Sequence, residues 1–184
     1  MRVIAGTSRG RRLATFTGHD IRPTPDRVRE ALFSILQSKL DNFAGLRVLD
    51  LFAGSGALSI EALSRGAAST CLVEMAPAAA KLLRENLNLC HFATAAEVII
   101  KDVFQALTQL KDRDFDLIFL DPPYGQGLAN RTLAEIERLK LLGKNGILCA
   151  ETGTDETFPL SVGHLQRIDQ RRYGTTMINF FTWS

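Results

Sequence analysis

The pattern that most constrains the fold is an alternation of short apolar runs with longer amphipathic stretches, which begins at residue 46. The runs have the length of strands and are almost continuously apolar: residues 46–52, 69–74, 97–101, 115–120 and 146–150. Strands that are buried on both faces of a sheet have this character. The stretches between them have helical spacing: residues 57–65, 77–89, 104–110 and 132–142. This order predicts an α/β fold with a doubly wound, mostly parallel, Rossmann-like sheet.

The C-terminal part departs from this alternation. Residues 164–173 and 175–183 are expected to form two strands joined at Gly174, which gives a sheet of about seven strands ending in a hairpin. A chain of 184 residues with 46% hydrophobic content suits one domain. We predict a single domain in which residues 1–40 form a small basic extension, packed on a body of residues 41–184.

The N-terminal extension is expected to contain a hairpin and a helix. Residues 2–5 and 11–16 are the two arms of the expected hairpin. Thr24 is a good N-cap and Pro25 suits the first helical position. The helix that follows has an apolar stripe made by Val28, Ala31, Leu32, Ile35 and Leu36.

The extension is also where positive charge gathers. The first 29 residues hold seven arginines and two aspartates, a net charge of +5, which leaves −3 for the rest of a chain whose total is +2. A basic segment on a slightly acidic body indicates a polyanionic partner. The residues expected to contact RNA or another polyanion are Arg9, Arg11, Arg12, Arg22, Arg27 and Arg29.

Composition argues against several classes of protein. No apolar run approaches the length that spans a bilayer, and the N-terminus lacks the apolar core of a signal peptide, so we expect a cytoplasmic location without membrane attachment. The three cysteines, Cys71, Cys90 and Cys149, form no C-x-x-C pair, and we expect no metal site.

A glycine-containing loop follows the first predicted strand, in the sequence Asp50-Leu51-Phe52-Ala53-Gly54-Ser55-Gly56. Gly54 and Gly56 allow the backbone to turn tightly and to approach a ligand closely. The helix after them directs free N–H groups toward that ligand. The alternative interpretation is a turn that only shortens the connection. No Lys-Ser or Lys-Thr pair follows the glycines, which excludes a phosphate-binding P-loop.

Acidic residues follow the second and third predicted strands. Glu74 lies about 20 residues beyond the glycines, where a carboxylate can accept hydrogen bonds from ribose hydroxyls. It could instead stabilise the N-terminus of the helix that starts at Pro77. Asp102 could accept a hydrogen bond from an adenine amino group, or it could simply cap the next helix. The glycine loop and Glu74 fit NAD and S-adenosylmethionine equally well.

The tetrapeptide Asp121-Pro122-Pro123-Tyr124 follows the fourth predicted strand directly. Two prolines fix the backbone and remove two N–H donors, so this turn offers a carboxylate, carbonyl oxygens and an aromatic ring. That set suits a planar base with an amino group: Asp121 and the Pro122 carbonyl accept the amino hydrogens while Tyr124 stacks on the ring. The alternative is an ordinary strand-ending turn. In a doubly wound sheet, however, the first and fourth strands flank the switch point where ligands bind.

With these motifs the chain resembles class I S-adenosylmethionine-dependent methyltransferases. Residues 121–124 match the (D/N/S)-P-P-(Y/F) motif of enzymes that methylate base amino groups. The resemblance is closest to the RsmD-type family of bacterial 16S ribosomal RNA guanine-N2 methyltransferases, and it covers nearly the whole chain. Segments at 2–6 and 9–11 are similar to that family's opening, and those at 22–24 and 26–30 to its helix start. The cofactor loop at 50–57 and the helix segment at 61–67 complete the match.

The resemblance implies roles for particular residues. Methyl transfer would be carried out by Asp121, Pro122, Pro123 and Tyr124. S-adenosylmethionine would be bound by Asp50, Phe52, Ala53, Gly54, Ser55, Gly56, Glu74, Met75, Asp102 and Val103. The substrate would be a guanine in 16S ribosomal RNA, either free or within an assembling small subunit, and the enzyme a monomer. Glu151 matches an acid often found after the fifth strand, and residues 152–172 match least well.

Three other functions compete with this one. A DNA adenine-N6 or cytosine-N4 methyltransferase would share the tetrapeptide, although such enzymes usually carry an additional target-recognition region. A nicotinamide-dependent oxidoreductase would share the glycine loop and Glu74, but not the Asp-Pro-Pro-Tyr turn. A non-catalytic RNA-binding module could keep the fold, but an intact Asp121 with both prolines argues against lost chemistry.

Overall fold

A computed structural model describes residues 1–15 and 26–184 of the chain. Along the sequence, the described elements are α1 (Asp26–Leu40), β1 (Arg47–Leu51), α2 (Ala57–Ser64), β2 (Ser69–Val73), α3 (Pro77–Leu89), the 3-10 helix η1 (Ala93–Ala95), β3 (Ala96–Ile99), α4 (Val103–Gln109), β4 (Phe115–Leu120), α5 (Leu128–Leu139), β5 (Leu142–Gly153), β6 (Ser161–Val162), β7 (Leu165–Tyr173) and β8 (Thr176–Trp183). The predicted α/β fold is confirmed.

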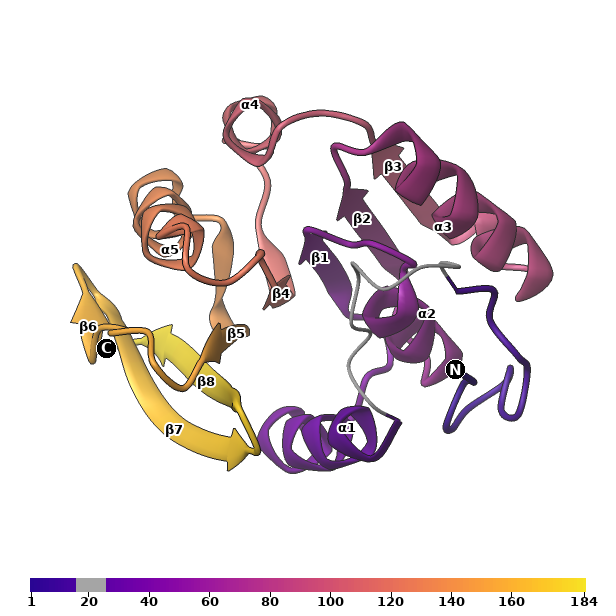
Figure 1. The fold of residues 1–184 in the computed structure, drawn as a ribbon, viewed down its shortest axis with the longest axis horizontal. Coiled ribbons are helices and arrows are strands. Elements are labelled where there is room, and N and C mark those ends of the chain that lie inside the picture. The colour runs from indigo at the N-terminus through magenta and orange to yellow at the C-terminus, as the bar shows by residue number, and fades with distance from the viewer. Residues whose placement is uncertain (16–25) are drawn as a thin grey trace.

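The strands of the described residues form one eight-stranded sheet in the order β3-β2-β1-β4-β5-β8-β7-β6 (Figure 1). The strands β1 to β5 are parallel to one another, whereas β8 pairs antiparallel with β5, β7 with β8, and β6 with β7. The chain moves outward from β1 to β3 and then returns to place β4 beside β1. That reversal makes the gap between β1 and β4 the topological switch point of the sheet.

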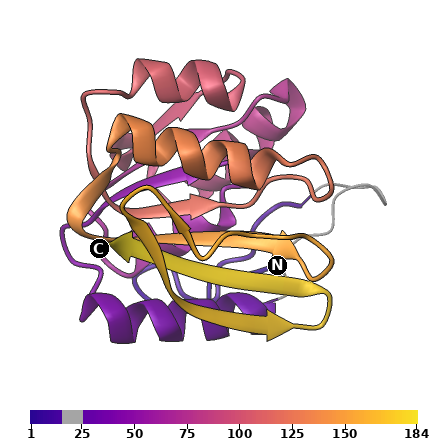
Figure 2. The same ribbon diagram turned by 90° about the vertical axis from the view of Figure 1, so that its left-hand side faces the viewer.

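Helices cover both faces of the sheet, as a doubly wound fold requires. One face is covered by α1, α2 and α3, which bury Leu36, Ile60 and Leu83 against it. The other face is covered by α4 and α5, which bury Leu107 and Leu133. Figure 2 shows α1 on one side of the sheet, and α4 and α5 on the other. None of the helices in residues 1–15 and 26–184 is both long enough and apolar enough to cross a membrane.

Several predicted boundaries were wrong, most clearly around α5. This helix begins at Leu128 rather than at residue 132, directly after Gly127 in the left-handed conformation, and Lys140 ends it with φ of 54°. Leu142 then belongs to β5, where it pairs with Phe115 of β4. The short elements η1 and β6 were not predicted, so the sheet has one strand more than expected.

The expected N-terminal hairpin is reduced to a single antiparallel bridge between Arg2 and Arg12. The expected helix start at Thr24 and Pro25 lies outside the described residues, as does Arg22. The helix itself is present as α1, but its buried residues are Arg29, Leu32, Phe33 and Leu36. The buried stripe is therefore rotated relative to the predicted one.

This rotation makes the prediction for Arg29 wrong. Its side chain is 1% exposed, and Nη2 donates to the Arg2 carbonyl oxygen (2.5 Å) and to Asp26 Oδ1 (2.9 Å). Burial lowers the pKa of the guanidinium, and the Asp26 carboxylate opposes that change. A side chain held in this way joins α1 to the N-terminal segment and does not reach an RNA phosphate.

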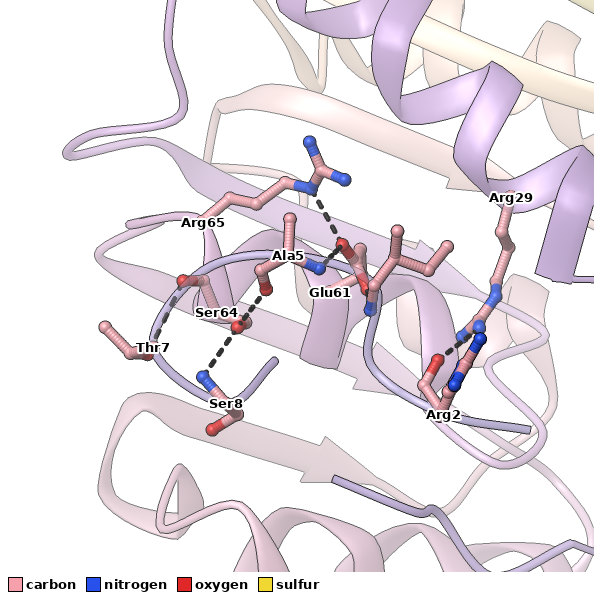
Figure 3. A network of polar contacts seen from close by, with 9 residues as sticks. Arg2, Ala5, Thr7, Ser8, Arg29, Glu61, Ser64 and Arg65 are labelled. Atoms are coloured by element: carbon pink, nitrogen blue, oxygen red, sulfur yellow. Dashed lines mark hydrogen bonds and ion pairs between the residues drawn. The ribbon is translucent and has the colours of Figure 1, made fainter. Parts of the chain in front are cut away.

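The N-terminal segment is fixed on α2 by two side chains of that helix (Figure 3). The Glu61 carboxylate is fully buried and accepts hydrogen bonds from the backbone N–H groups of Ile4 (2.7 Å) and Ala5 (3.0 Å) and from Arg65 Nε (2.8 Å). Ser64 Oγ donates to the Ala5 carbonyl oxygen (2.5 Å) and accepts from Ser8 N–H (2.9 Å). These bonds satisfy backbone groups that would otherwise be buried without partners.

Gly6 and Gly10 give a matched test of this packing. Both have φ of +81°, but a Cβ at Gly6 would lie 1.7 Å from the Ser64 carbonyl oxygen, whereas a Cβ at Gly10 would meet nothing within 4 Å. We expect Gly10→Ala to cost about 1–2 kcal/mol from backbone strain. Gly6→Ala should cost about 1–3 kcal/mol beyond that, because the segment must move off α2. Urea unfolding of the two variants measures this difference, and equal costs would contradict the packing described.

Candidate active site

An acidic residue stands at or just beyond the carboxyl end of each of the five parallel strands. In sheet order these are Asp102 after β3, Glu74 after β2, Asp50 in β1, Asp121 after β4 and Glu151 in β5. Neighbouring strands of a parallel sheet end at the same edge, so the five carboxyl groups form a row along it. Within the described part of the chain, no three His, Cys, Asp or Glu side chains are grouped as a metal ion would require.

The glycine loop joins β1 to α2 at this edge. Phe52, Gly54 and Gly56 all have positive φ, of 65°, 55° and 76°. The loop is tied to β2, because Ala53 N–H donates to the Val73 carbonyl oxygen (3.0 Å) and Gly54 N–H donates to Glu74 Oε2 (2.9 Å). A Cβ at Gly56 would lie 3.1 Å from Leu83 Cγ, so a larger residue there would press on α3.

Glu74 holds two segments together. Its Oε2 accepts from the glycine loop, and its Oε1 accepts from Ala76 N–H (2.7 Å), the N-cap residue of α3. The alternative role for Glu74, which is to stabilise the N-terminus of α3, is therefore present, because the carboxylate contacts the start of that helix. Beside it, Met75 is 65% exposed, which is unusual for a large apolar side chain.

Asp102 has a contact of the same kind. Its Oδ1 accepts from Phe104 N–H (2.9 Å) and Gln105 N–H (3.4 Å), so it is the N-cap of α4. Val103 is buried behind it. The capping alternative for Asp102 is thus present, and a contact with adenine stays a prediction.

Asp50 lies beneath the glycine loop, where it is almost fully buried. Ser59 Oγ donates to its Oδ2 (2.9 Å), and Ser59 in turn shares a hydrogen bond with Thr70 Oγ1 (2.8 Å). Burial, with a smaller contribution from the charge of Glu74, raises the pKa of Asp50 to about 7, and the hydrogen bonds from Ser59 oppose this rise. Asp50 therefore joins the end of β1 to α2 through Ser59 and changes charge near neutral pH.

The Asp121–Tyr124 turn crosses the switch point beside this loop. Asp121 N–H donates to the Leu51 carbonyl oxygen at the end of β1 (3.4 Å), which places the turn next to the start of the glycine loop. Pro122 is buried, whereas Pro123 and Tyr124 are exposed, Tyr124 by 43%. The tetrapeptide and the glycine loop, far apart in the sequence, are thus neighbours.

Two glutamates hold this turn in place. The Tyr124 hydroxyl donates to Glu151 Oε1 (2.6 Å) and lies 3.2 Å from Thr176 Oγ1. Burial and the bond to Glu151 raise the pKa of the Tyr124 hydroxyl, so it stays neutral and donates. Glu156 accepts from Gly125 N–H (2.8 Å) and from Gly153 N–H (2.7 Å), and so joins the turn to the end of β5. The role of Glu151 could not be predicted from the sequence, and Glu156 was not predicted as a site residue, because no motif marks it.

Asp121 and Glu151 share a small recess between the sheet and α1. Its other lining residues are apolar or weakly polar: Leu32, Leu58, Phe119, Leu120, Cys149 and Ile178. Burial raises the pKa of Asp121 well above its usual value, and the charges of Glu151 and Asp50 raise it further. A cationic or hydrogen-donating ligand in this recess would relieve that repulsion.

Of the predicted RNA-binding arginines within residues 1–15 and 26–184, none lines this recess. Arg9 and Arg12 are exposed on the N-terminal segment, and Arg27 is exposed on α1. Arg11 donates to the Leu89 carbonyl oxygen at the end of α3. The turn that carries Arg9 packs on Ser64, the last residue of α2, whereas the recess lies near the first residue of that helix.

A protein-family model described as "Conserved hypothetical protein 95" matches residues 1–182. The chain belongs to this family. The chain is similar to the "Ribosomal RNA small subunit methyltransferase D" of Escherichia coli K12. The two are 36% identical over 159 residues, which cover 86% of this chain and 78% of that protein. The "Putative rRNA methyltransferase YlbH" of Bacillus subtilis is 36% identical over 183 residues and 98% of both chains. The RsmD-type resemblance is therefore confirmed.

Solved structures agree with the family assignment. The structure described as "Putative methyltransferase yhhF from Escherichia coli" is 33% identical, covers 100% of this chain and 98% of its own, and has a TM-score of 0.87. A Thermus thermophilus protein, TTHA0928, is 32% identical over 98% of each chain with a TM-score of 0.82. The N-terminal segment and C-terminal hairpin therefore belong to the fold that this family shares.

The raised pKa of Asp50 predicts how the stability of this family member depends on pH. An acid whose folded pKa exceeds its unfolded value binds more protons when folded. Its contribution to stability is therefore lost as pH rises from about 4 to about 7, by about 1.4 kcal/mol per pH unit. Asp121 acts in the same direction. Asp50→Asn keeps an oxygen that can accept from Ser59, and we expect it to flatten this dependence. Urea unfolding at about pH 5 and pH 7 measures it; an equal pH effect in both proteins would contradict the assignment.

Proposed function

We propose that this protein transfers the methyl group of S-adenosylmethionine to the exocyclic N2 amine of a guanine in small-subunit (16S) ribosomal RNA. The observation that carries the proposal is the contact between the Asp121–Tyr124 turn and the end of β1, which sets an amine-accepting turn beside a cofactor-type glycine loop. Family members named as ribosomal RNA methyltransferases support the same reaction. We propose a cytoplasmic monomer whose substrate is ribosomal RNA, either free or within an assembling small subunit.

The residues present fit S-adenosylmethionine better than a dinucleotide. The carboxyl groups of this row that are ionised repel anions, and the pyrophosphate of NAD would add two negative charges beside Glu74. S-adenosylmethionine carries a sulfonium and an ammonium group, which such a row attracts. In this proposal Glu74 accepts from the ribose hydroxyls, and the backbone of residues 52–56 follows the cofactor. Exposed Met75, together with Asp102 and Val103, would hold the adenine.

The cofactor supplies an activated methyl group, and the protein supplies position and charge. Asp121 and the Pro122 carbonyl accept the two hydrogens of the guanine amine, which directs the nitrogen lone pair toward the methyl group. Tyr124, held by Glu151 and Thr176, presents its exposed ring for stacking on the base. Bound beside this turn, S-adenosylmethionine would supply the methyl group, with a nitrogen–carbon bond replacing the carbon–sulfur bond and the electron pair of that bond remaining on sulfur. The amine then loses a proton to Asp121, directly or through water.

A base inside a helix cannot reach Asp121 and Tyr124. The target guanine must be unpaired or flipped out of its stack before Tyr124 can contact it. The test of the proposed function offers ribosomal RNA, assembling 30S particles and DNA side by side, with S-adenosylmethionine tritiated in its methyl group. We expect label in RNA and none in DNA. Label in DNA alone would show that the base-methylating site serves another nucleic acid.

The proposed contact between Glu74 and the cofactor can be tested by substitution. Glu74→Ala removes the carboxylate proposed to bind the ribose, and we expect S-adenosylmethionine binding to weaken by about 1.5–3 kcal/mol. Glu74→Gln keeps one acceptor oxygen and should lose less. The control is Glu97→Gln. Glu97 lies on β3 in an exposed ion pair with Arg113, and this variant should bind S-adenosylmethionine with normal affinity. Calorimetry measures the three affinities, and an unchanged affinity in Glu74→Ala would remove the residue from the cofactor site.

The proposed role of Asp121 in the reaction can also be tested by substitution. Asp121→Asn replaces one acceptor oxygen with a donor, so kcat should fall by about a hundredfold or more while cofactor affinity changes little. In the unmodified enzyme, kcat should rise with pH through the raised pKa of Asp121, because only the carboxylate accepts both an amine hydrogen and the proton. The variant should lack that rise. Full turnover in Asp121→Asn would mean that this carboxylate has no role in the reaction.

A further inference from the structure

The turn between β7 and β8 reaches the candidate active site. Tyr173 pairs with Thr176 across Gly174 and Thr175, and Thr176 Oγ1 lies 3.2 Å from the Tyr124 hydroxyl. Thr154 N–H, beyond the end of β5, donates to the Thr175 carbonyl oxygen (3.0 Å). In Figure 2 this turn lies at the edge to which the parallel strands point. The turn is therefore fixed against the residues proposed to hold the base.

Two arginines precede this turn on β7, next to the strand β8 that supplies Ile178 to the recess. Arg171 lies opposite Ile178, which lines the recess together with Asp121 and Glu151. Arg172 lies opposite Met177, the residue next to Thr176. Side chains alternate along a strand, so the two guanidinium groups flank the turn on opposite faces of the sheet. Both residues are exposed.

The contacts of these arginines leave them able to bind an anion. Arg171 Nη2 lies 3.2 Å from Asp169 Oδ2, but this arginine side chain is 56% exposed, and exposed ion pairs hold their partners weakly. Asp169 also pairs with Lys39 of α1 (3.2 Å), so its single charge is shared by two cations. Arg172 Nε donates to the Gly174 carbonyl oxygen (3.1 Å), which lays the side chain along the turn.

A base held by Asp121 and Tyr124 brings its phosphates close to the row of carboxyl groups. Those groups repel a polyanion, so productive binding requires positive charge near the entrance. Arg9 is poorly placed for this, because the turn that carries it packs at the opposite end of α2. Arg171 and Arg172 lie opposite Ile178 and Met177 of β8, close in sequence to Thr176, which contacts Tyr124.

We propose that Arg171 and Arg172 bind the phosphates on either side of the target nucleotide, and that the β7–β8 turn orients the RNA over the recess. This inference rests on the proposed function and adds to it the surface that the substrate contacts. It assigns a role to a part of the chain that sequence analysis matched least well.

The experiment compares Arg171→Gln/Arg172→Gln with Arg138→Gln. Arg138 is a matched control, because it is also exposed and paired with a carboxylate, but it lies in the last turn of α5, at the opposite edge of the sheet (Figure 2). Binding of a fluorescent single-stranded RNA is followed as salt is raised. Each lost phosphate contact should flatten the log–log slope by about 0.7, so the double variant should lose about 1.4 and the control nothing.

Methylation kinetics with the same RNA give a second readout. The double variant should show a raised KM for RNA, with kcat and S-adenosylmethionine affinity near those of the unmodified enzyme. Arg171→Lys/Arg172→Lys keeps the charge and should restore most of the salt slope. An equal thermal midpoint in all variants shows that the fold is kept.

The outcomes separate this inference from the proposed function. If the unmodified enzyme methylates RNA and the double variant has the same salt slope and KM, the surface is wrong while the function stands. If no RNA is methylated but the slope still depends on both arginines, the surface stands and the reaction is wrong. If the control loses as much as the double variant, the effect is one of total charge, and the assignment to this turn falls.

Discussion

Repulsion among carboxyl groups at one edge of a parallel sheet is the constraint around which the site is arranged. Parallel strands end together, so acids that follow each strand cannot avoid one another. The protein offsets part of this cost with backbone donors, since Glu74 and Asp102 each accept two N–H groups. Asp50 receives a hydroxyl, whereas Asp121 keeps a strongly raised pKa. A row of this kind selects against anionic cofactors and favours a ligand that carries positive charge.

The same constraint explains why the base-binding turn needs support from outside the parallel strands. Tyr124 donates to Glu151 and lies beside Thr176, and Glu156 joins Gly125 to Gly153. The supporting residues come from β5, from the loop after it and from the C-terminal hairpin. The antiparallel strands therefore do more than extend the sheet, because they fix the turn at the switch point.

The elements with a strong local signal could be predicted from the sequence. The strands at Ser69–Val73 and Phe115–Leu120 and the helix at Pro77–Leu89 were placed within a residue, since continuous apolar runs and a proline at a helix start are local features. The start of α5 was missed because Gly127 in a left-handed conformation begins it, and nothing in the sequence distinguishes that glycine from Gly125.

The errors at the N-terminus have a different cause, which is long-range contact. Arg29 lies three and four residues before Leu32 and Phe33, so a stripe through Phe33 would have placed it on the buried face. Choosing the stripe through Val28 instead left it exposed. Nor does the sequence show that Glu61 is fully buried, because its partners at Ile4 and Ala5 are more than fifty residues away. Polar residues whose partners are distant carry no periodic signal.

Charge therefore has to be divided across the molecule. An enzyme that binds a cationic cofactor at an acidic edge must still attract a polyanionic substrate to that edge, and the two demands cannot be met by the same side chains. A total charge of +2 conceals this separation. Of the acids at the strand ends, Asp50 is buried and the other four are partly buried, which strengthens their fields, whereas five arginines are exposed where phosphates reach them: Arg9, Arg12, Arg27, Arg171 and Arg172. The depth of each charge, rather than the net charge, lets one edge of the sheet serve both partners.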